Sequence, residues 1–75
     1  MPLKDYILIE HAKDRMRDRG ISEDDLELVL MEAEIKHPGL RGDINLIKTI
    51  KGRKIKISYV MDGKKKKIIT VIVVS

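Results

Sequence analysis

His11 and Arg15 are the side chains of this sequence whose types and spacing best suit chemistry on a charged substrate. They are four residues apart in a segment predicted to be helical, so both project from the same face of that helix. An imidazole is well suited to proton transfer near neutral pH, and a guanidinium can hold a phosphate through two hydrogen bonds. The pair is therefore a candidate for acid–base chemistry beside a bound phosphate.

Structural roles would account for the same residues. A histidine at the start of a helix is often a hydrogen-bonding cap or a packing residue, and Arg15 can pair with Asp18 or with the next helix. Arg19 is expected to be structural, either bonding the carbonyls at the helix end or pairing with Asp25. The residue types alone leave both interpretations of His11 and Arg15 open.

Two helices are expected to position these residues. The first covers residues 10–19 and ends at Gly20, where a left-handed residue terminates a helix. Ser22 begins a second helix as its N-cap, with Asp25 as the acid of a capping box, and that helix ends near Ala33. Its exposed acidic side chains would be repelled by phosphate, which excludes a DNA-reading helix–turn–helix. The residues expected to face the core are Ala12, Met16, Leu26, Val29, Leu30 and Ala33.

Beyond the helices the apolar period changes to two, which is typical of strands. Strands are expected over residues 44–50, 54–61 and 66–74, with turns at Lys51-Gly52-Arg53 and Asp62-Gly63. The segment His37-Pro38-Gly39 is interpreted as a turn, and residues 6–9 as an extended segment or the approach to the first helix. The sequence therefore predicts an α+β fold in one domain over residues 1–75, with two N-terminal helices packed on a three- to four-stranded antiparallel β-meander.

The strands differ in how clearly their faces are marked. In the second, Ile55, Ile57, Tyr59 and Met61 are expected to face the helices, and Lys54, Lys56 and Ser58 to face away. The third is apolar on both faces, so we expect a partner subunit or loops to cover its second face. The face of Thr70 stays open. A two-residue turn at Asp62-Gly63 places Thr70 beside Ile55 and Ile57, whereas a three-residue turn places it beside Lys54 and Lys56.

Charge is divided along the chain. Residues 1–36 carry six Lys and Arg against ten Asp and Glu, a net of −4, whereas residues 37–75 carry ten against two, a net of +8. A basic half favours a polyanionic partner, because phosphate neutralisation supplies most non-specific affinity for nucleic acid. Alternatively, the two halves attract each other within one fold. The charge pattern leaves both interpretations open.

Composition excludes several other classes of protein. The chain has no cysteine and two histidines, so neither a disulfide nor a structural zinc site is expected. A charged fraction of 37% with one asparagine and no glutamine is typical of thermophiles. The start of the sequence does not have the layout of a signal peptide, and the longest apolar run, residues 68–74, is too short to cross a bilayer. A cytoplasmic protein without membrane contact is expected.

The segment from His11 to Ser22 resembles the H-A-x-x-R-M-x-x-R-G-I-S signature that opens domain of unknown function family 4258. The later segment Ile69-Thr70-Val71 resembles the closing part of that family, so the resemblance covers nearly the whole chain. Glu10 departs from the pattern, because a Ser or Thr is expected there. The family looks like a compact relative of the RelE/BrnT-type toxin fold, in which helices precede an antiparallel sheet. Many members of that wider group are metal-independent ribonucleases neutralised by an antitoxin protein.

The resemblance implies RNA as the substrate and no cofactor or metal. A ribonuclease of this kind needs a base for a ribose 2′-OH, cations for the developing phosphate charge and an acid for the leaving oxygen. The residues expected to be catalytic are His11, Arg15 and Thr70, and those expected to contact phosphate are Lys54, Lys56, Tyr59 and Arg19. The alternative is a non-catalytic module of the same fold that binds nucleic acid or protein, as a monomer or a homodimer. The RNA target, the antitoxin and the oligomeric state do not follow from the sequence.

Overall fold

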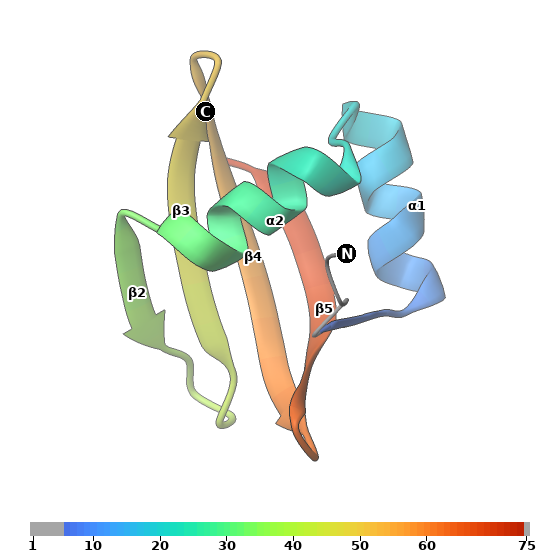
Figure 1. Ribbon diagram of the computed structural model, residues 1–75, viewed down its shortest axis with the longest axis vertical. Coiled ribbons are helices and arrows are strands. Elements are labelled where there is room, and N and C mark those ends of the chain that lie inside the picture. Colours follow the sequence, from blue (N-terminus) through green and yellow to red (C-terminus); the bar gives the residue numbers. More distant parts are fainter. Residues whose placement is uncertain (1–5, 75) are drawn as a thin grey trace.

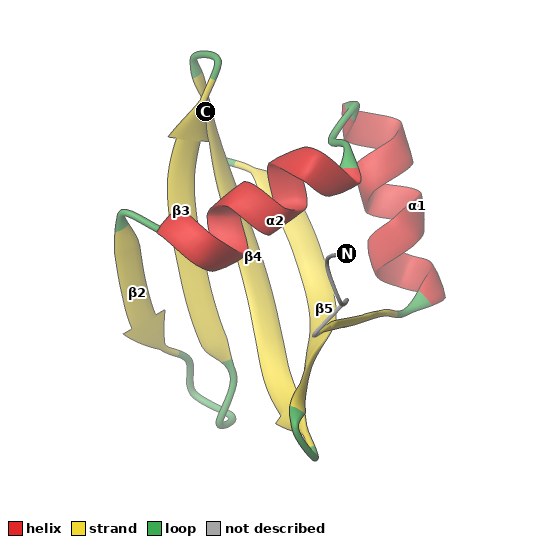
Figure 2. Ribbon diagram, in the orientation of Figure 1, coloured by secondary structure: helices red, strands yellow, loops and turns green. Residues whose placement is uncertain are grey.

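Two helices and a five-stranded mixed sheet make up the computed structural model, which describes residues 6–74 (Figures 1 and 2). The helices are α1 (Glu10–Arg19) and α2 (Glu23–Glu32), and the strands are β1 (Tyr6–Leu8), β2 (Ile35–Pro38), β3 (Ile44–Ile50), β4 (Arg53–Asp62) and β5 (Lys65–Val73). The strand order is β1-β5-β4-β3-β2, with β1 parallel to β5 and the other pairs antiparallel. Helix α2 crosses one face of the sheet over β3 and β4, and α1 packs beside β5 (Figure 1).

The predicted α+β order of helices before the main strands is confirmed, but the number and direction of the strands were wrong. The sheet has five strands, and β1 makes it mixed rather than antiparallel. Both additional strands lie at the edges and are only three and four residues long. Segments this short carry no period from which a strand can be predicted. Neither helix among residues 6–74 is long and apolar enough to cross a membrane.

His37 lies in a strand, so the prediction of a turn at His37-Pro38-Gly39 was wrong. Residues Ile35–Pro38 form β2, in which His37 pairs with Asn45 of β3. The chain leaves the strand after Pro38, and the Gly39 N–H donates to the carbonyl of Asp43 at 2.8 Å. Pro38 is tolerated because β2 is an edge strand that needs few ladder hydrogen bonds. His37 therefore occupies a fixed place in the sheet.

The corner between the helices forms as predicted. Helix α1 spans Glu10–Arg19, and Gly20 ends it with a φ of 65°, a left-handed conformation that glycine adopts without a steric penalty. The Ser22 hydroxyl accepts from the Asp25 N–H at 3.1 Å, and the Asp25 carboxylate accepts from the Ser22 N–H at 3.4 Å. This capping box fixes the start of α2 and hence the angle at which it crosses the sheet.

The core lies between the helices and the face of the sheet that they cover. Its fully buried side chains are Ala12, Leu26, Val29, Ile55, Ile57, Ile68 and Val71, with Met16, Ile21, Leu46, Ile50, Tyr6 and Tyr59 nearly so. Met61 was expected to join them but is 57% exposed. It pairs with Lys66 near the β4–β5 turn, which extends beyond the part of the sheet that the helices cover (Figure 1).

The turn between β4 and β5 sets the register at which these strands begin to pair. Asp62 pairs with Lys65, which leaves a two-residue turn of Gly63 and Lys64. Continued without interruption, this register would place Thr70 opposite Ile57, on the covered face. A two-residue turn alone would thus give the first of the two placements predicted for Thr70.

A β-bulge in β5 reverses that placement. Tyr59 pairs with Ile68, but Ser58 pairs with Thr70, so Ile69 is an extra residue without a partner. The shift moves the following side chains of β5 by one position relative to β4. Thr70 therefore lies on the face of Ser58, away from the helices, although the turn has two residues.

Candidate functional site

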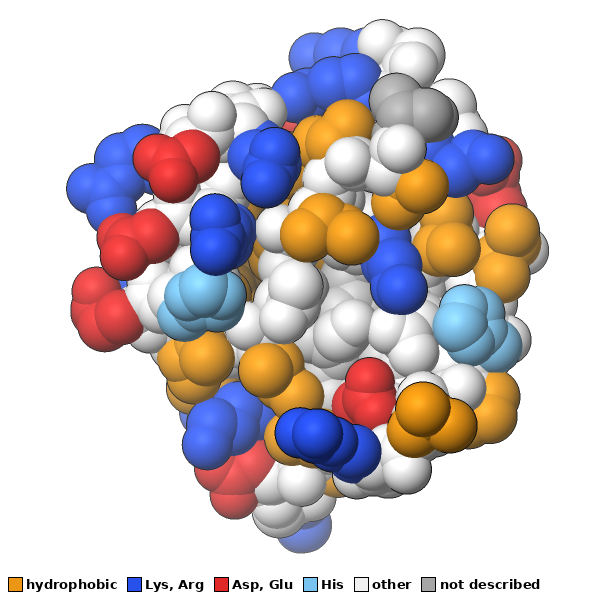
Figure 3. All heavy atoms as spheres, turned by 180° about the vertical axis from the view of Figure 1, so that it is seen from behind, with side chains coloured by type: hydrophobic (Ala, Val, Ile, Leu, Met, Phe, Trp, Pro, Cys, Tyr) orange, Lys and Arg blue, Asp and Glu red, His pale blue; other side chains and the backbone are white. Residues whose placement is uncertain are grey.

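The face of the sheet that the helices leave uncovered is called the open face here. Figure 3 shows the molecule from this side: hydrophobic and basic side chains are interspersed across it, and histidine side chains lie at both flanks. A face built only for solvent would carry fewer hydrophobic side chains, and one built only for burial would carry fewer lysines. The residues on it follow from the strand register.

Four polar residues lie side by side across the open face, one on each of β2, β3, β4 and β5. His37 pairs with Asn45, Asn45 with Ser58, and Ser58 with Thr70. Directly paired residues of neighbouring strands point to the same face of a sheet. These four residues are called the polar row.

Asn45 is the centre of the polar row and is only 6% exposed, although no helix covers it. The Ser58 hydroxyl donates to Asn45 Oδ1 at 2.6 Å. Asn45 Nδ2 makes no hydrogen bond within residues 6–74. Every buried side-chain nitrogen or oxygen in that range has a hydrogen-bond partner, so Nδ2 is not buried and reaches the surface. The row therefore presents a fixed N–H donor toward solvent.

Two lysines of β4 share the open face with the polar row. Lys56 lies two residues before Ser58, and its partners on the neighbouring strands are Ile47 and Ile72. Its side chain is half-buried, as expected when an aliphatic stem packs between isoleucines and the ammonium stays in water. Lys54 is exposed and lies further along the same strand. Two cations thus stand on one side of the polar row.

Helix α1 places His11 and Arg15 at the flank beside β5. Ala12 and Met16 are the buried residues of this helix, and His11 and Arg15 each precede one of them, so they lie along one side of the buried stripe. His11 is exposed and Arg15 is half-buried. Within residues 6–74 neither side chain has a hydrogen bond or ion pair, so the capping bond considered for His11 and the ion pairs considered for Arg15 are not observed there.

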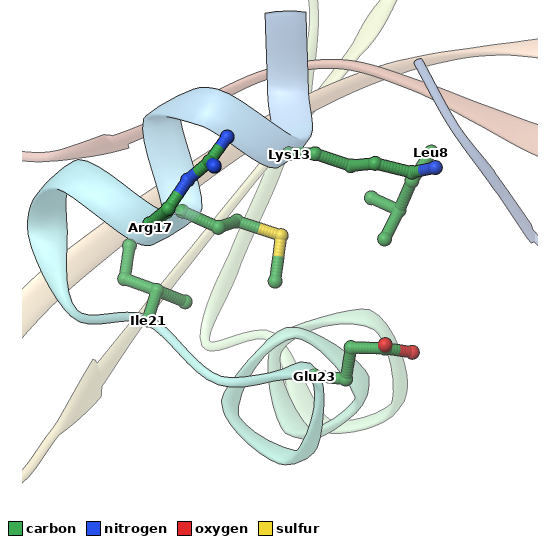
Figure 4. A pocket seen from close by; sticks show the side chains of 6 residues that line it. Leu8, Lys13, Arg17, Ile21 and Glu23 are labelled. Carbon is green, nitrogen blue, oxygen red and sulfur yellow. The ribbon is translucent and has the colours of Figure 1, made fainter. Parts of the chain in front are cut away.

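A pocket of about 250 Å³ lies on the other side of that buried stripe, between α1, α2 and β1. Its lining residues are Leu8, Lys13, Met16, Arg17, Ile21 and Glu23. Figure 4 shows Lys13 reaching toward Leu8 and Glu23 approaching from the first turn of α2. Lys13 pairs with Glu10 at 3.7 Å, and Arg17 pairs with Asp14. None of the residues predicted to be functional lines this pocket.

Tyr6 lies beneath the start of α2 and bonds two of its carboxylates. Its hydroxyl is 3.0 Å from Glu27 Oε2 and 3.1 Å from Glu23 Oε1. Burial, followed by these hydrogen bonds and the negative charges of the two glutamates, raises the pKa of Tyr6 far above its usual range. The phenol therefore stays protonated and acts as a structural link between β1 and α2.

The predicted site residues of the strands separate onto two faces. Lys54, Lys56 and Thr70 share the open face. Tyr59 lies on the covered face and is 5% exposed, so it cannot contact a ligand that Lys54 and Lys56 bind. The alternation of β4 places adjacent residues on opposite faces, and this separates Tyr59 from the lysines.

The structural role expected of Arg19 belongs to Arg53. Arg53 Nη1 donates to the Arg19 carbonyl at 2.7 Å, and its Nη2 donates to the Gly20 carbonyl at 3.2 Å. Its Nη2 also lies 3.8 Å from Asp25 Oδ2. Arg53 thus ties the first residue of β4 to the corner between the helices. The side chain of Arg19 is exposed and has no partner within the described range 6–74.

Sequence reasoning missed the residues at the centre of the polar row. Asn45 and His37 carry no motif, and Ser58 was noted only as facing away from the helices. One signal was present, because Asn45 is the only asparagine of the sequence and lies in a predicted strand, where asparagine is disfavoured. The partners that make these residues a row became visible only with the strand register.

The comparison with models of protein families identifies the family of this chain. No group of three or more His, Asp and Glu side chains within residues 6–74 is arranged to hold a metal ion. No curated protein and no solved structure matches the chain. The family described as Domain of unknown function (DUF4258) matches residues 8–73. Because that match includes both helices and β2 to β5, the chain belongs to the DUF4258 family.

Proposed function

We propose that this domain binds RNA on its open face and cleaves a phosphodiester bond there, as a compact relative of the RelE/BrnT toxin type. The observation that carries the proposal is the bulge at Ile69, which sets Thr70 in line with Ser58 and beside Lys56. Bulges are frequent next to active sites, where they redirect a side chain. A hydroxyl and an ammonium on one surface are groups that hold a phosphate.

The charge of the open face supports an RNA backbone as the ligand. Lys54, Lys56 and Lys67 all lie on this face, in the half of the chain with a net charge of +8. Both tyrosines, Tyr6 and Tyr59, are buried on the covered side, so no aromatic ring is free there to stack on a base. Binding through phosphates without stacking depends strongly on salt and weakly on sequence.

The cleavage step needs a base, an acid and cations. The base removes the proton of a ribose 2′-OH, the 2′-oxygen bonds to phosphorus, and the bond from phosphorus to the 5′-oxygen breaks. Cations stabilise the charge that collects on the phosphate oxygens. His11 and Arg15, which α1 holds beside β5, are the base and the phosphate clamp that the sequence suggests. Thr70 lies on the open face of β5, the strand beside which α1 packs.

An RNA assay with matched variants tests the proposal. We expect wild type to bind and cleave a labelled single-stranded RNA, and Lys56→Ala and Thr70→Val to weaken binding several-fold. Lys13→Ala removes the same charge from α1 on the pocket side and is the control. His11→Ala tests the predicted base, and equal cleavage by wild type and His11→Ala would remove His11 from that role. Absence of cleavage by wild type would contradict the ribonuclease function.

A second candidate is a non-catalytic module whose open face binds a protein, either a second copy or an antitoxin. Three isoleucines favour it, because Ile35, Ile47 and Ile72 lie on this face and Ile35 is 49% exposed. Hydrophobic side chains that extend across neighbouring strands are typical of protein interfaces. A concentration-dependent mass in sedimentation equilibrium, lost in Ile47→Lys, would support a homodimer. A constant monomer mass without RNA would exclude it.

A further inference from the structure

We propose that His37 is the general base of this site and that the polar row holds the scissile phosphate beside it. The inference rests on the proposed RNA-cleaving function and deepens it, because His37 then takes the role that the sequence suggests for His11. Three features of His37 carry it: the proton on its ring, its neighbours in the row, and its exposure.

A hydrogen bond within β2 determines which ring nitrogen of His37 carries the proton. Nδ1 lies 3.3 Å from the carbonyl oxygen of Pro38. A carbonyl only accepts hydrogen bonds, so in the neutral ring this contact favours the tautomer in which Nδ1 carries the proton and Nε2 keeps its lone pair. The side chain is exposed, which leaves Nε2 open to a substrate. No residue in the described range bonds His11, so no contact there selects its tautomer.

The neighbours of His37 supply hydrogen-bond donors for a phosphate. Asn45, opposite His37, presents its Nδ2 to the surface, and Lys56 brings a positive charge to the same side of the sheet. Adjacent strands are about 4.8 Å apart, so the backbones of His37 and Ser58 are separated by about 10 Å, and those of His37 and Thr70 by about 14 Å. His37 and Asn45 can therefore contact the same nucleotide, whereas Thr70 contacts the next phosphate along the RNA.

Charged groups on the same side of the sheet come from two other elements, the loop before β3 and β4, which lies two strands away from β2. Lys56 projects from β4, and Asp43 lies in the loop before β3, where its Oδ1 accepts from the Arg41 N–H at 3.3 Å. The Asp43 carboxylate packs against Gly39, since a Cβ there would be 2.2 Å from Oδ1. The loop thus holds this carboxylate close to the strand that carries His37. On β2 itself, Lys36 points to the other face of the sheet.

The reaction balances without a metal or an external reagent. Nε2 takes the proton of the 2′-OH, the 2′-oxygen forms a bond to phosphorus, and the bond from phosphorus to the 5′-oxygen breaks. The 5′-oxygen takes a proton from solvent, and the imidazolium returns its proton to solvent. The products are a 2′,3′-cyclic phosphate and a 5′-hydroxyl. Asn45 is a positioning residue for the phosphate, because its amide donates a hydrogen bond and transfers no proton.

The test compares two histidine sites in the full chain. His37→Asn keeps an N–H donor for the Pro38 carbonyl but removes the base, and His37→Gln is a second variant for the case that one does not fold. Both substitutions are at an exposed edge-strand position. His11→Gln is the competing variant. Cleavage of a labelled RNA is followed as a function of pH, and binding is measured with the 2′-deoxy form of the same oligonucleotide, which cannot be cleaved.

We expect both His37 variants to lose about 100-fold or more in cleavage rate and to bind the 2′-deoxy oligonucleotide within about 2-fold of wild type. They also lose the rise in rate with pH that reports deprotonation of the base. The His11→Gln variant loses far less. If wild type cleaves and the His37 variants cleave equally well, the inference falls and the RNA-cleaving function stands. If wild type cleaves no RNA, the proposed function falls and the inference with it.

Discussion

The two faces of the sheet are made by the same central strands but follow different rules. On the covered face, Ile55 and Ile57 of β4 and Val71 of β5 are fully buried beneath the helices. On the open face, the neighbouring positions Ser58 and Thr70 are polar. Strand propensity favours β-branched and aromatic residues on both faces. Asn45, which pairs with Ser58, departs from that preference, because asparagine is disfavoured in strands.

The two faces also differ in the groups that they contain: apolar side chains that stabilise the fold on the covered face, and polar groups that reach solvent on the open face. The covered face depends on apolar area removed from water, and the helices are tied to it by Arg53 and Tyr6. On the open face, the Ser58 hydroxyl donates to the side-chain oxygen of Asn45, which leaves Asn45 Nδ2 for solvent. Changes on the first face should alter stability, and changes on the second should alter binding.

The largest expected effect comes from opening a cavity on the covered face. Ile57 is 0% exposed, so Ile57→Ala should lower the free energy of unfolding by about 3 kcal/mol, within the range for buried Ile→Ala changes. The adjacent Ser58→Ala points to the other face and should cost about 1 kcal/mol or less. Urea unfolding of both variants measures the difference. Equal losses would mean that the open face is also a structural core.

Removing the tie between the sheet and the helix corner should come next. Arg53→Ala leaves two carbonyls of that corner without their donor and should cost about 1 to 2 kcal/mol, since the side chain is partly exposed. Arg17→Ala removes an exposed pair with Asp14 and should cost about 0.5 kcal/mol or less. Thermal unfolding of the two variants decides the point. A loss no larger for Arg53 than for Arg17 would contradict this role.

Tyr6 makes the covered face sensitive to alkali. Its pKa is raised on folding, so its contribution to stability is fully present below about pH 10 and decreases as pH rises toward the folded-state pKa. Tyr6→Phe should cost about 1 kcal/mol at neutral pH and should weaken the alkaline loss of stability. Urea midpoints from pH 7 to pH 11 measure both. A wild-type and a Tyr6→Phe curve with the same alkaline slope would rule out this contribution.

The smallest effect on stability, and a clear one on binding, is expected for Lys56. Lys56→Ala should leave the urea midpoint nearly unchanged. It should reduce the salt dependence of RNA binding, so that the slope of log K against log salt becomes less negative by about 0.7. Fluorescence anisotropy at several salt concentrations gives the slope. Lys13→Ala, the control on the pocket side, should keep the wild-type slope. A reduced slope for Lys13→Ala alone would place the RNA on the helices.

Local signals in the sequence predict the helical half of the fold well. Gly20 and Ser22 act through their own backbone neighbours, so the end of α1 and the start of α2 follow from a few residues. The main strands were also located within one residue at each end, because turn residues separate them and β4 keeps a clear apolar alternation. Each of these features depends on contacts that are close in sequence.

The features that required the structure depend on distant contacts. Thr70 changes face through a bulge at Ile69, and a bulge leaves no trace in a strand that is apolar on both sides. His37 looked like part of a turn because of the Pro and Gly that follow it, yet its pairing with Asn45 makes it a strand residue. The clamp by Arg53 joins residues more than 30 positions apart. None of the three has a local pattern from which it can be predicted.

The side-chain amide of Asn45 offers the most direct test of the open face as the functional face. The chain has one asparagine and no glutamine, so its nitrogen-15 spectrum contains a single side-chain amide pair. Adding the 2′-deoxy form of a single-stranded RNA should shift that pair, together with the backbone signals of Lys56, Ser58 and Thr70. Signals of α2 should remain in place. An unmoved Asn45 amide, with shifts confined to the helices, would contradict the account.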